Sequence, residues 1–390
     1  MIYFLPTYEE AKQIAEKYDN FQFYEKEQIV DGYTIKTFNY RLVGYNDFEY
    51  PLGKDSDVKA FELRGICYVF NLDGSLFKRY LLMNKFFNLN QVESTLYENI
   101  KHLKFKEVHN KEDGSVINFI KLPNGRTLAK SKMQVDNEQA TNALEVYNKK
   151  PEVKKVVEWA LSNDIMPIFE YVSPSNRVVL KYKETDLVLL RLRCLETGNY
   201  LDLSTYPDLS EVRVVESEDY TTWDELNALA ETATDKEGWV VTFEDNPDLD
   251  LAKKKTTWYC DRHHLLTDDV YREDFIIRKT IENTIDDVIA QVDHDDFEVL
   301  EIIDRVVSTT IEYIKNAVKK TEDTIAIFEK DFSSDKKAFV LGYGKKDKYL
   351  SYTLAVVNGK TDVLEVVQRD LIDNTTKLER ARTFIENGDF

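Results

Sequence analysis

A lysine followed by two acids and a glycine stands between two strand-like segments of this chain. The run is Lys111-Glu112-Asp113-Gly114-Ser115. Taken alone, a run of this composition fits a solvated hairpin turn as well as a reactive site. A lysine amine acts as a nucleophile where its surroundings lower its pKa from the usual value of about 10.4. The run therefore makes Lys111 a candidate covalent nucleophile.

Further charged residues interrupt segments that are otherwise apolar. Glu170 lies inside the strand-like residues 168–172, and Glu237 directly precedes another strand. Lys253 and Lys255 alternate along a third strand, so both side chains should point to one face. Each charge alone would suit an edge strand. The four features in this order indicate a functional site instead.

The elements that must position these groups are mostly strands up to about residue 264. Thr7 and Glu10 first predict a capping box on a short N-terminal helix. Turn signals and β-branched or aromatic residues then predict strands at 33–40, 62–70, 75–82, 115–122, 167–172, 177–182, 187–194, 239–243 and 251–256. Helices are predicted at 138–147, 152–162 and 223–231.

The hydrophobic period becomes helical beyond about residue 265. Val299, Ile302, Ile303 and Val306 fall at helical intervals, and the pattern continues to residue 325. Residues 363–385 also fit a helix, whereas residues 338–357 fit either a hairpin or helices. We therefore predict an α+β chain with an antiparallel-sheet domain at residues 1–265. An all-helical C-terminal domain at residues 266–390 follows it.

Charge and composition limit the partners of the chain. The formal net charge is -19, and residues 266–390 carry 27 acidic against 18 basic residues. Any nucleic-acid surface must therefore be a focused cleft. No apolar run approaches the ~18 residues that span a bilayer. The three cysteines lack metal-ligand spacing, and we expect a soluble, cytoplasmic protein with no membrane partner.

The order of these charged features is that of the covalent nucleotidyltransferases, and the chain resembles the RNA ligase 1 family of T-even bacteriophages. The resemblance covers roughly residues 30–265 and is fainter beyond. The matching runs are residues 62–66, 85–90, 111–115, 130–132 with 138–140, 176–180, and 253–255 ahead of Trp258-Tyr259. One departure is Lys254, where the family has an apolar residue. We expect this side chain to face away from the nucleotide, toward solvent or RNA.

The resemblance implies a three-step reaction. A lysine attacks the α-phosphorus of ATP, the AMP moves to an RNA 5′-phosphate, and a 3′-hydroxyl then displaces the AMP. It implies Lys111 as the nucleophile, with Lys253 and Lys255 lowering its pKa and neutralising phosphate charge.

The resemblance also assigns the nucleotide and metal contacts. Glu170 would bind the ribose hydroxyls, and Glu237 a hydrated Mg²⁺. The implied contacts to base or phosphates are Tyr40, Arg64, Lys85, Lys132 and Tyr259. An acidic pair, Asp286-Asp287, matches residues of the family's C-terminal domain that would bind a divalent ion.

The family further implies a monomer that repairs broken tRNA in the cytoplasm of an infected bacterial host. Three other functions stay open at this point: an mRNA capping enzyme, a DNA ligase, and a non-catalytic RNA-binding protein on the same fold. A capping enzyme or DNA ligase generally carries a strand-rich OB-fold after the last lysine motif, and the helical pattern argues against both. The presence of Lys111, Lys253 and Lys255 argues against a non-catalytic protein.

Overall fold

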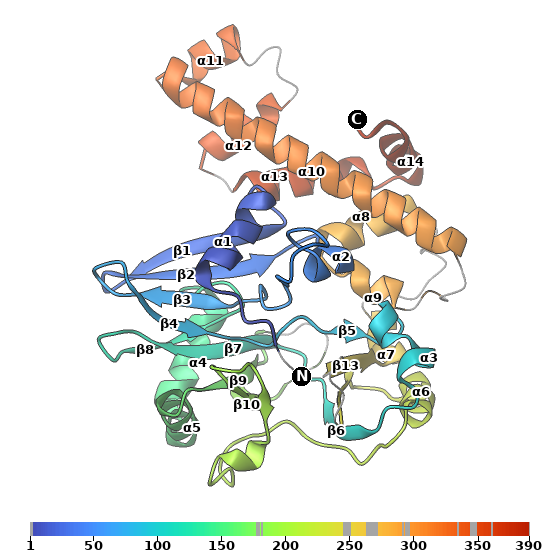
Figure 1. Cartoon of the computed structure of the whole chain (residues 1–390). Coiled ribbons are helices and arrows are strands. Elements are labelled where there is room, and N and C mark those ends of the chain that lie inside the picture. Colours follow the sequence, from blue (N-terminus) through green and yellow to red (C-terminus); the bar gives the residue numbers. More distant parts are fainter. Residues whose placement is uncertain are drawn as a thin grey trace. The chain divides into compact units, whose positions relative to one another are not determined.

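The chain folds into two compact units, residues 1–265 and residues 266–390 (Figure 1). The computed structural model describes residues 3–176, 180, 182–244, 251–262, 272–290, 292, 297–333, 335–343, 349–359 and 362–389. Within the described residues, the first unit contains three β-sheets and the second unit contains helices. The functional role of each unit stays a prediction.

The first sheet carries the N-terminal helix on one face. The predicted capping box is confirmed, because the Thr7 side chain accepts from the Glu10 backbone and the Glu10 side chain accepts from the Thr7 backbone. Tyr8 packs against Phe38 and Tyr68 of the sheet. The strands are antiparallel in the order β1-β2-β3-β4. The bounds are α1 (Tyr8–Lys17), β1 (Phe23–Val30), β2 (Tyr33–Tyr40), α2 (Tyr45–Glu49), β3 (Cys67–Phe70) and β4 (Leu76–Tyr80).

The second sheet has five antiparallel strands in the order β11-β10-β9-β7-β8. Two amphipathic helices, α4 and α5, pack against it through β7, β8, β9 and β10. Pro151 begins α5, where its fixed φ suits the first helical turn. The bounds are β7 (Ser115–Lys121), β8 (Thr127–Lys130), α4 (Glu138–Lys149), α5 (Pro151–Ser162), β9 (Ile165–Val172), β10 (Asp186–Cys194) and β11 (Tyr200–Leu201).

The third sheet joins segments that are far apart in the sequence. Its order is β5-β13-β12-β6, with a short parallel pairing of β5 and β13 and antiparallel pairings elsewhere. Helix α6 packs against β13 and α7. The bounds are β5 (Phe87–Asn88), α3 (Tyr97–Ile100), β6 (Phe105–Asn110), α6 (Trp223–Thr232), β12 (Gly238–Phe243), β13 (Leu251–Lys255) and α7 (Thr257–Arg262).

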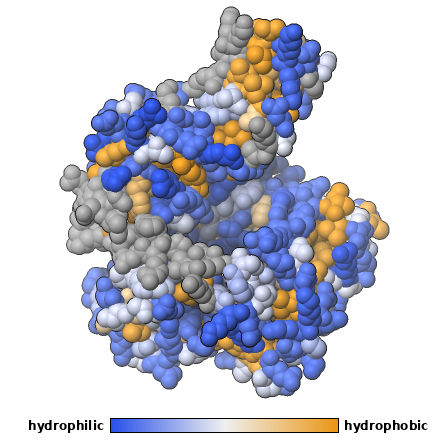
Figure 2. Space-filling view, turned by 180° about the vertical axis from the view of Figure 1, so that it is seen from behind, coloured by the Kyte–Doolittle hydropathy of each residue, from blue (hydrophilic) through white to orange (hydrophobic). Residues whose placement is uncertain are grey.

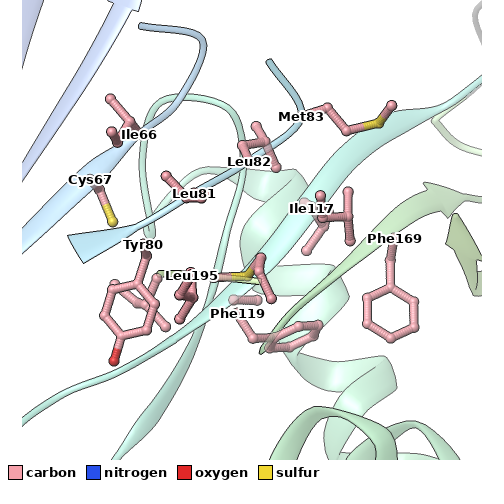
Figure 3. Close-up of a cluster of buried hydrophobic side chains, with 14 of the residues drawn as sticks. Ile66, Cys67, Tyr80, Leu81, Leu82, Met83, Ile117, Phe119, Phe169 and Leu195 are labelled. Carbon is pink, nitrogen blue, oxygen red and sulfur yellow. The ribbon is translucent and has the colours of Figure 1, made fainter. Parts of the chain in front are cut away.

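The first and second sheets share one apolar core, part of which Figure 3 shows. Ile66 and Cys67 reach it from the first sheet's side, and Ile117, Phe119 and Phe169 reach it from the second. All five side chains are fully buried. Burial of each large apolar side chain stabilises the fold by roughly 1.5–3 kcal/mol. The third sheet has a separate core around two tryptophans on α6 and β12.

The second unit is organised around one long helix, α10. Helices α8, α12, α13 and α14 all pack against it. Its buried positions Val306, Tyr313, Ile314 and Ala317 follow the helical period that the sequence predicts. The bounds are α8 (Glu273–Ile281), α9 (Ile285–Ile289), α10 (Phe297–Asp331), α11 (Lys336–Gly342), α12 (Leu350–Val357), α13 (Val363–Asn374) and α14 (Leu378–Asn387).

The predicted fold class is confirmed, with some differences in the elements. The strand predicted at 62–70 begins only at Cys67, because the preceding residues turn and Gly65 has φ +99°, which a strand cannot accommodate. The ambiguous residues 338–357 hold the helices α11 and α12. The predicted strand 177–182 lies mostly outside the described residues. Its described members Leu180 and Tyr182 are not in a strand.

No helix within the described residues is both long and apolar enough to span a bilayer. Figure 2 shows one face, on which hydrophilic residues predominate and apolar residues gather in small separate groups. Scattered exposed apolar side chains of this kind are normal for a folded chain. They indicate no particular partner.

Candidate active site

Lys111 lies in a four-residue connection between β6 and β7, residues 111–114, which we call the lysine loop. The Lys111 backbone N–H donates to the Gly238 carbonyl at 2.9 Å. The Gly114 backbone N–H donates to Glu170 Oε1 at 3.1 Å. A Cβ on Gly114 would meet the Tyr171 carbonyl at 2.3 Å, so only glycine lets the loop lie this close to β9.

Glu237 joins two of the predicted lysines. Its Oε1 atom lies 2.7 Å from Lys111 Nζ and 3.4 Å from Lys255 Nζ. The carboxylate is only 3% exposed, whereas Lys111 is 24% exposed. Glu237 precedes β12, and Gly238 pairs with Lys255 in the ladder. The sheet register therefore brings these three charged side chains together, in a setting where water screens their interaction poorly.

Glu170 faces the same group of charges from β9. Burial raises the pKa of Glu170 to about 8, while the positive charge of Lys111 lowers it. Glu237 raises the pKa further, and Arg64 and the Gly114 N–H oppose this. The Glu170 carboxyl can therefore gain or lose its proton close to neutral pH, which is typical of functional sites.

The three lysines of β13 divide between the two faces of the strand. Lys253 pairs with Val240 and with Asn88 in the ladders, and shares a face with Lys255 by the strand period. Lys254 lies on the other face, where burial lowers its pKa and the charge of Glu231 raises it. Lys254 thus faces away from Glu237, and its orientation relative to the nucleotide stays a prediction. The side chain is half-buried and lies within the field of Glu231 on α6, whereas we expected solvent or RNA.

Two predicted cations lie beside the Tyr40 ring, and Arg64 lies on a segment that packs near one of them. Lys85 Nζ lies 5.7 Å and Lys132 Nζ 5.4 Å from its centroid, within the range of cation–π attraction. Arg64 donates to the Met83 carbonyl at 3.2 Å. A Cβ on Gly65 would meet the Lys132 carbonyl at 2.7 Å, so the segment after Arg64 packs directly on that of Lys132. These contacts place Lys85 and Lys132 beside one aromatic ring, with the segment that follows Arg64 packed on that of Lys132.

Of the remaining predicted site residues, Tyr259 joins the site around Lys111, and the Asp286–Asp287 pair lies in the second unit. Tyr259 is on α7, where its hydroxyl donates to Asp113 Oδ1 at 2.9 Å and its ring lies 5.0 Å from Lys255 Nζ. Asp286 and Asp287 are on α9 in the second unit. Within the part of the chain that the structure describes, no three acidic, histidine or cysteine side chains group as a metal site. The metal role of the Asp286–Asp287 pair stays a prediction.

Two residues of this site had no role in the sequence predictions. Asp113 is 3% exposed, and its carboxylate accepts from Tyr259 and, at 2.7 Å, from the Leu180 backbone. The Tyr182 hydroxyl accepts from the Asp113 N–H at 2.9 Å and donates to Glu112 Oε2 at 2.8 Å. The acid directly before Gly114 was the only sequence signal for Asp113, and Tyr182 has none.

The family of the chain follows from its similarity to known proteins. A sequence model of the RNA ligase family matches residues 62–262, which is just over half of the chain. This region contains every predicted site residue except Tyr40 and the Asp286–Asp287 pair. The chain belongs to this RNA ligase family, the one named for the T4-type RNA ligase 1.

Individual relatives are more distant. A Thermovibrio ammonificans protein that carries the provisional name RNA ligase is 27% identical over 232 residues. This match covers 59% of this chain and 58% of that protein. A solved archaeal ATP-dependent RNA ligase is 17% identical with a TM-score of 0.45, covering 75% of this chain and 76% of that one. A Naegleria gruberi RNA ligase variant solved with ATP and Mn is 20% identical with a TM-score of 0.38, covering 46% and 57%.

Proposed function

We propose that the chain is an ATP-dependent RNA ligase that joins 5′-phosphate and 3′-hydroxyl ends, with Lys111 as the covalent nucleophile. The observation that carries the proposal is the sharing of Glu237 Oε1 by Lys111 and Lys255. Membership of the RNA ligase family supports it. The site offers what such a reaction needs: an amine, two carboxyl groups and several cations for phosphates.

In the first step, Lys111 Nζ loses its proton and attacks the α-phosphorus of ATP. A phosphorus–nitrogen bond forms, the bond to pyrophosphate breaks, and pyrophosphate leaves. Because phosphoryl transfer depends mainly on positioning and electrostatics, Lys253 and Lys255 would neutralise the charge that grows on the phosphate oxygens.

Glu237 suits a divalent ion by the chemistry of its donor atoms. Mg²⁺ typically uses one or two protein carboxylates and keeps several waters, and a nearly buried carboxylate beside the nucleophile meets that need. A bound Mg²⁺ would supply positive charge beside the reacting phosphate. In its absence, the same carboxylate holds the Lys111 ammonium in place.

The side chains around Lys111 and those around Tyr40 would hold the nucleotide and the RNA phosphates. Glu170 would accept hydrogen bonds from the ribose hydroxyls. Arg64, Lys85 and Lys132 would bind phosphates of ATP or of the RNA end, with Tyr40 as an aromatic surface for the base. The AMP then passes to the RNA 5′-phosphate, and attack by the 3′-hydroxyl releases it.

The RNA class is the finer part of the proposal. The resemblance to T-even RNA ligase 1 supports a monomer that reseals broken tRNA, acting in an infected bacterial host. Because the chain carries a net charge of -19, RNA must be bound by shape and a few local cations. The described elements of residues 266–390 are all helices, which argues against a capping enzyme or DNA ligase with an OB-fold.

The test is incubation with α-labelled ATP and Mg²⁺, followed by denaturing electrophoresis. Pretreatment with pyrophosphate removes any AMP already attached. We expect a labelled protein that requires ATP rather than GTP, with no label in Lys111→Ala. Lys255→Met should lose most of the label, whereas Lys254→Met, its neighbour on the opposite face, should keep it.

Two outcomes would contradict the proposal. Label that persists in Lys111→Ala would place the nucleophile elsewhere. Folded, AMP-free protein that takes no label from any nucleotide would favour a non-catalytic RNA-binding protein. Mass spectrometry of the untreated protein separates this second case from a chain that is already fully adenylylated.

A further inference from the structure

The lysine loop is held by a residue outside every run that resembles the family. Its second and third members, Glu112 and Asp113, both bond to the Tyr182 hydroxyl. Tyr182 lies between β9 and β10, 69 residues from Asp113 along the chain. One phenol thus uses its acceptor and its donor on adjacent residues of the loop that carries Lys111.

The Tyr182 ring is fixed by its surroundings. It packs on an apolar cluster formed by Val172 of β9, Val188 of β10 and Val215. The Arg213 guanidinium lies 5.9 Å from the ring centroid. Nearby, the Leu180 N–H donates to the Asp113 carboxylate, so the same segment contacts the loop twice. The hydroxyl is therefore presented by a ring that packs on valines of β9 and β10.

The hydroxyl also determines where the Glu112 carboxylate lies. Glu112 is the immediate neighbour of Lys111, and its Oε2 atom accepts from Tyr182 at 2.8 Å. Lys111 Nζ pairs instead with Glu237, 2.7 Å away. While the Glu112 carboxylate accepts from Tyr182, the carboxylate partner of Lys111 is Glu237, the residue before β12. Release of Glu112 would offer a second, competing partner next to the nucleophile.

We propose that Tyr182 is a positioning residue for Lys111, one that acts through the Glu112–Asp113 backbone and the Glu112 carboxylate. This inference rests on the proposed ligase function. Nucleophilic attack requires the reacting atoms to approach within about 3–3.5 Å in line, and a displacement of about 1 Å costs roughly 100-fold in rate. Loss of the two bonds lets the loop and its lysine shift, while the residues that bind RNA keep their places.

The test compares two rates in the same protein preparation. The first is single-turnover formation of labelled lysyl-AMP at saturating ATP. The second is sealing of an RNA whose 5′ end already carries AMP, a reaction that forms its bond between two RNA ends without the Lys111 amine. Because both rates scale with the amount of folded protein, their ratio is insensitive to a loss of stability.

We expect Tyr182→Phe to slow lysyl-AMP formation by roughly 10- to 100-fold, with an unchanged KM for ATP and near-normal sealing of the pre-activated RNA. Tyr80→Phe is the matched control, because the Tyr80 hydroxyl also donates one hydrogen bond and accepts another, in its case to the carbonyl and from the N–H of Lys121. Tyr80→Phe should leave the ratio of lysyl-AMP formation to sealing of the pre-activated RNA unchanged. Glu112→Gln keeps acceptor oxygen for Tyr182 and should change the ratio less than Tyr182→Phe.

Three results would overturn the inference: an unchanged rate of labelling in Tyr182→Phe, an equal fall in both reactions, or the same change in Tyr80→Phe. Failure of the wild-type protein to become labelled is a different result. It would remove the proposed ligase function itself.

Discussion

The two units satisfy their buried polar groups in different ways. In the first unit, the partners are far apart in the sequence: Arg193 holds Glu62 through two hydrogen bonds across 131 residues, and Tyr259 reaches Asp113 across 146. In the second unit, the hydroxyls of Thr280, Thr310, Thr321, Thr324 and Thr375 each donate to a carbonyl four residues earlier. A Tyr313–Tyr352–Asp370 chain links separate helices there.

The difference shows where the fold depends on exact pairing of distant segments. A threonine bonded within its own helix needs only that helix, whereas Glu62, Asp113 and Glu237 need several strands in register at once. Substitutions at these long-range pairs should therefore be costly, and those at the helical hydroxyls mild. Four changes test this contrast. Tryptophan fluorescence in urea follows the first unit, because all four tryptophans lie in residues 1–265. Far-UV circular dichroism follows the helices of both units, so the second unit is read from the difference between the two signals.

The largest effect is expected at the Arg193–Glu62 pair. Arg193 is 0% and Glu62 3% exposed, so Arg193→Met leaves a buried carboxylate without its charge partner. We expect the free energy of unfolding of the first unit to fall by about 3–5 kcal/mol, measured by tryptophan fluorescence in urea. The double change Glu62→Leu with Arg193→Met should recover most of it. A loss below about 1 kcal/mol would show that the long-range pair is not important for stability.

The next effect is expected on chemistry rather than stability. Glu237→Gln keeps the shape of the side chain but removes the charge shared by Lys111 and Lys255. We expect lysyl-AMP formation to slow by roughly 10²-fold, as for loss of one preorganised charged group. Glu231→Gln, an exposed change of the same kind on α6, is the control. Equal rates in the two variants would contradict the role of Glu237.

A smaller effect is expected in the pH dependence of stability. Burial raises the pKa of Glu170 to about 8 from its ordinary 4.5, so the folded chain binds this proton more tightly than the unfolded chain. The contribution is present at low pH and is lost as the pH rises from 4.5 through about 8. Glu170→Gln should flatten the fall in unfolding free energy over this range by a few kcal/mol, since each pKa unit corresponds to about 1.4 kcal/mol.

The reference for this titration is Glu211→Gln, an exposed substitution in the same unit. It should reproduce the wild-type slope. If Glu170→Gln also keeps the wild-type slope, the Glu170 carboxyl is already ionised in the folded chain well below neutral pH.

The smallest effect is expected within the helical unit. Thr310→Val removes the bond from its buried hydroxyl to the Val306 carbonyl and keeps the volume. Because that carbonyl remains part of the helix ladder, we expect a change within about 1 kcal/mol, followed by circular dichroism at the helical minimum. If Thr310→Val lowered the free energy of unfolding as much as Arg193→Met, the proposed difference between the two units would be wrong.

The fold class and the charged residues of the site could both be predicted from the sequence, for the same reason. Residues such as Glu170 and Lys255 break local apolar patterns, and local patterns are what a sequence displays. The strand predicted at 62–70 begins late because residues 62–65 form a turn, in which Leu63 is buried although it belongs to no ladder. Tyr182 was missed because a hydrogen bond across 69 residues leaves no period or motif. The proximity of Lys254 to Glu231 on α6 likewise depends on packing that no local pattern encodes.

The third sheet also has a consequence for the time at which a newly made chain becomes competent. Its β5 and β6 strands are complete by residue 110, but they pair with β12 and β13, which end at residue 255. Such distant pairings form slowly, since a long loop must close before any contact compensates its entropy. A growing polypeptide therefore carries Lys111 out of the ribosome well before Glu237 and Lys255 exist to meet it. The reactive lysine stays without its partners until about two thirds of the chain has been synthesised.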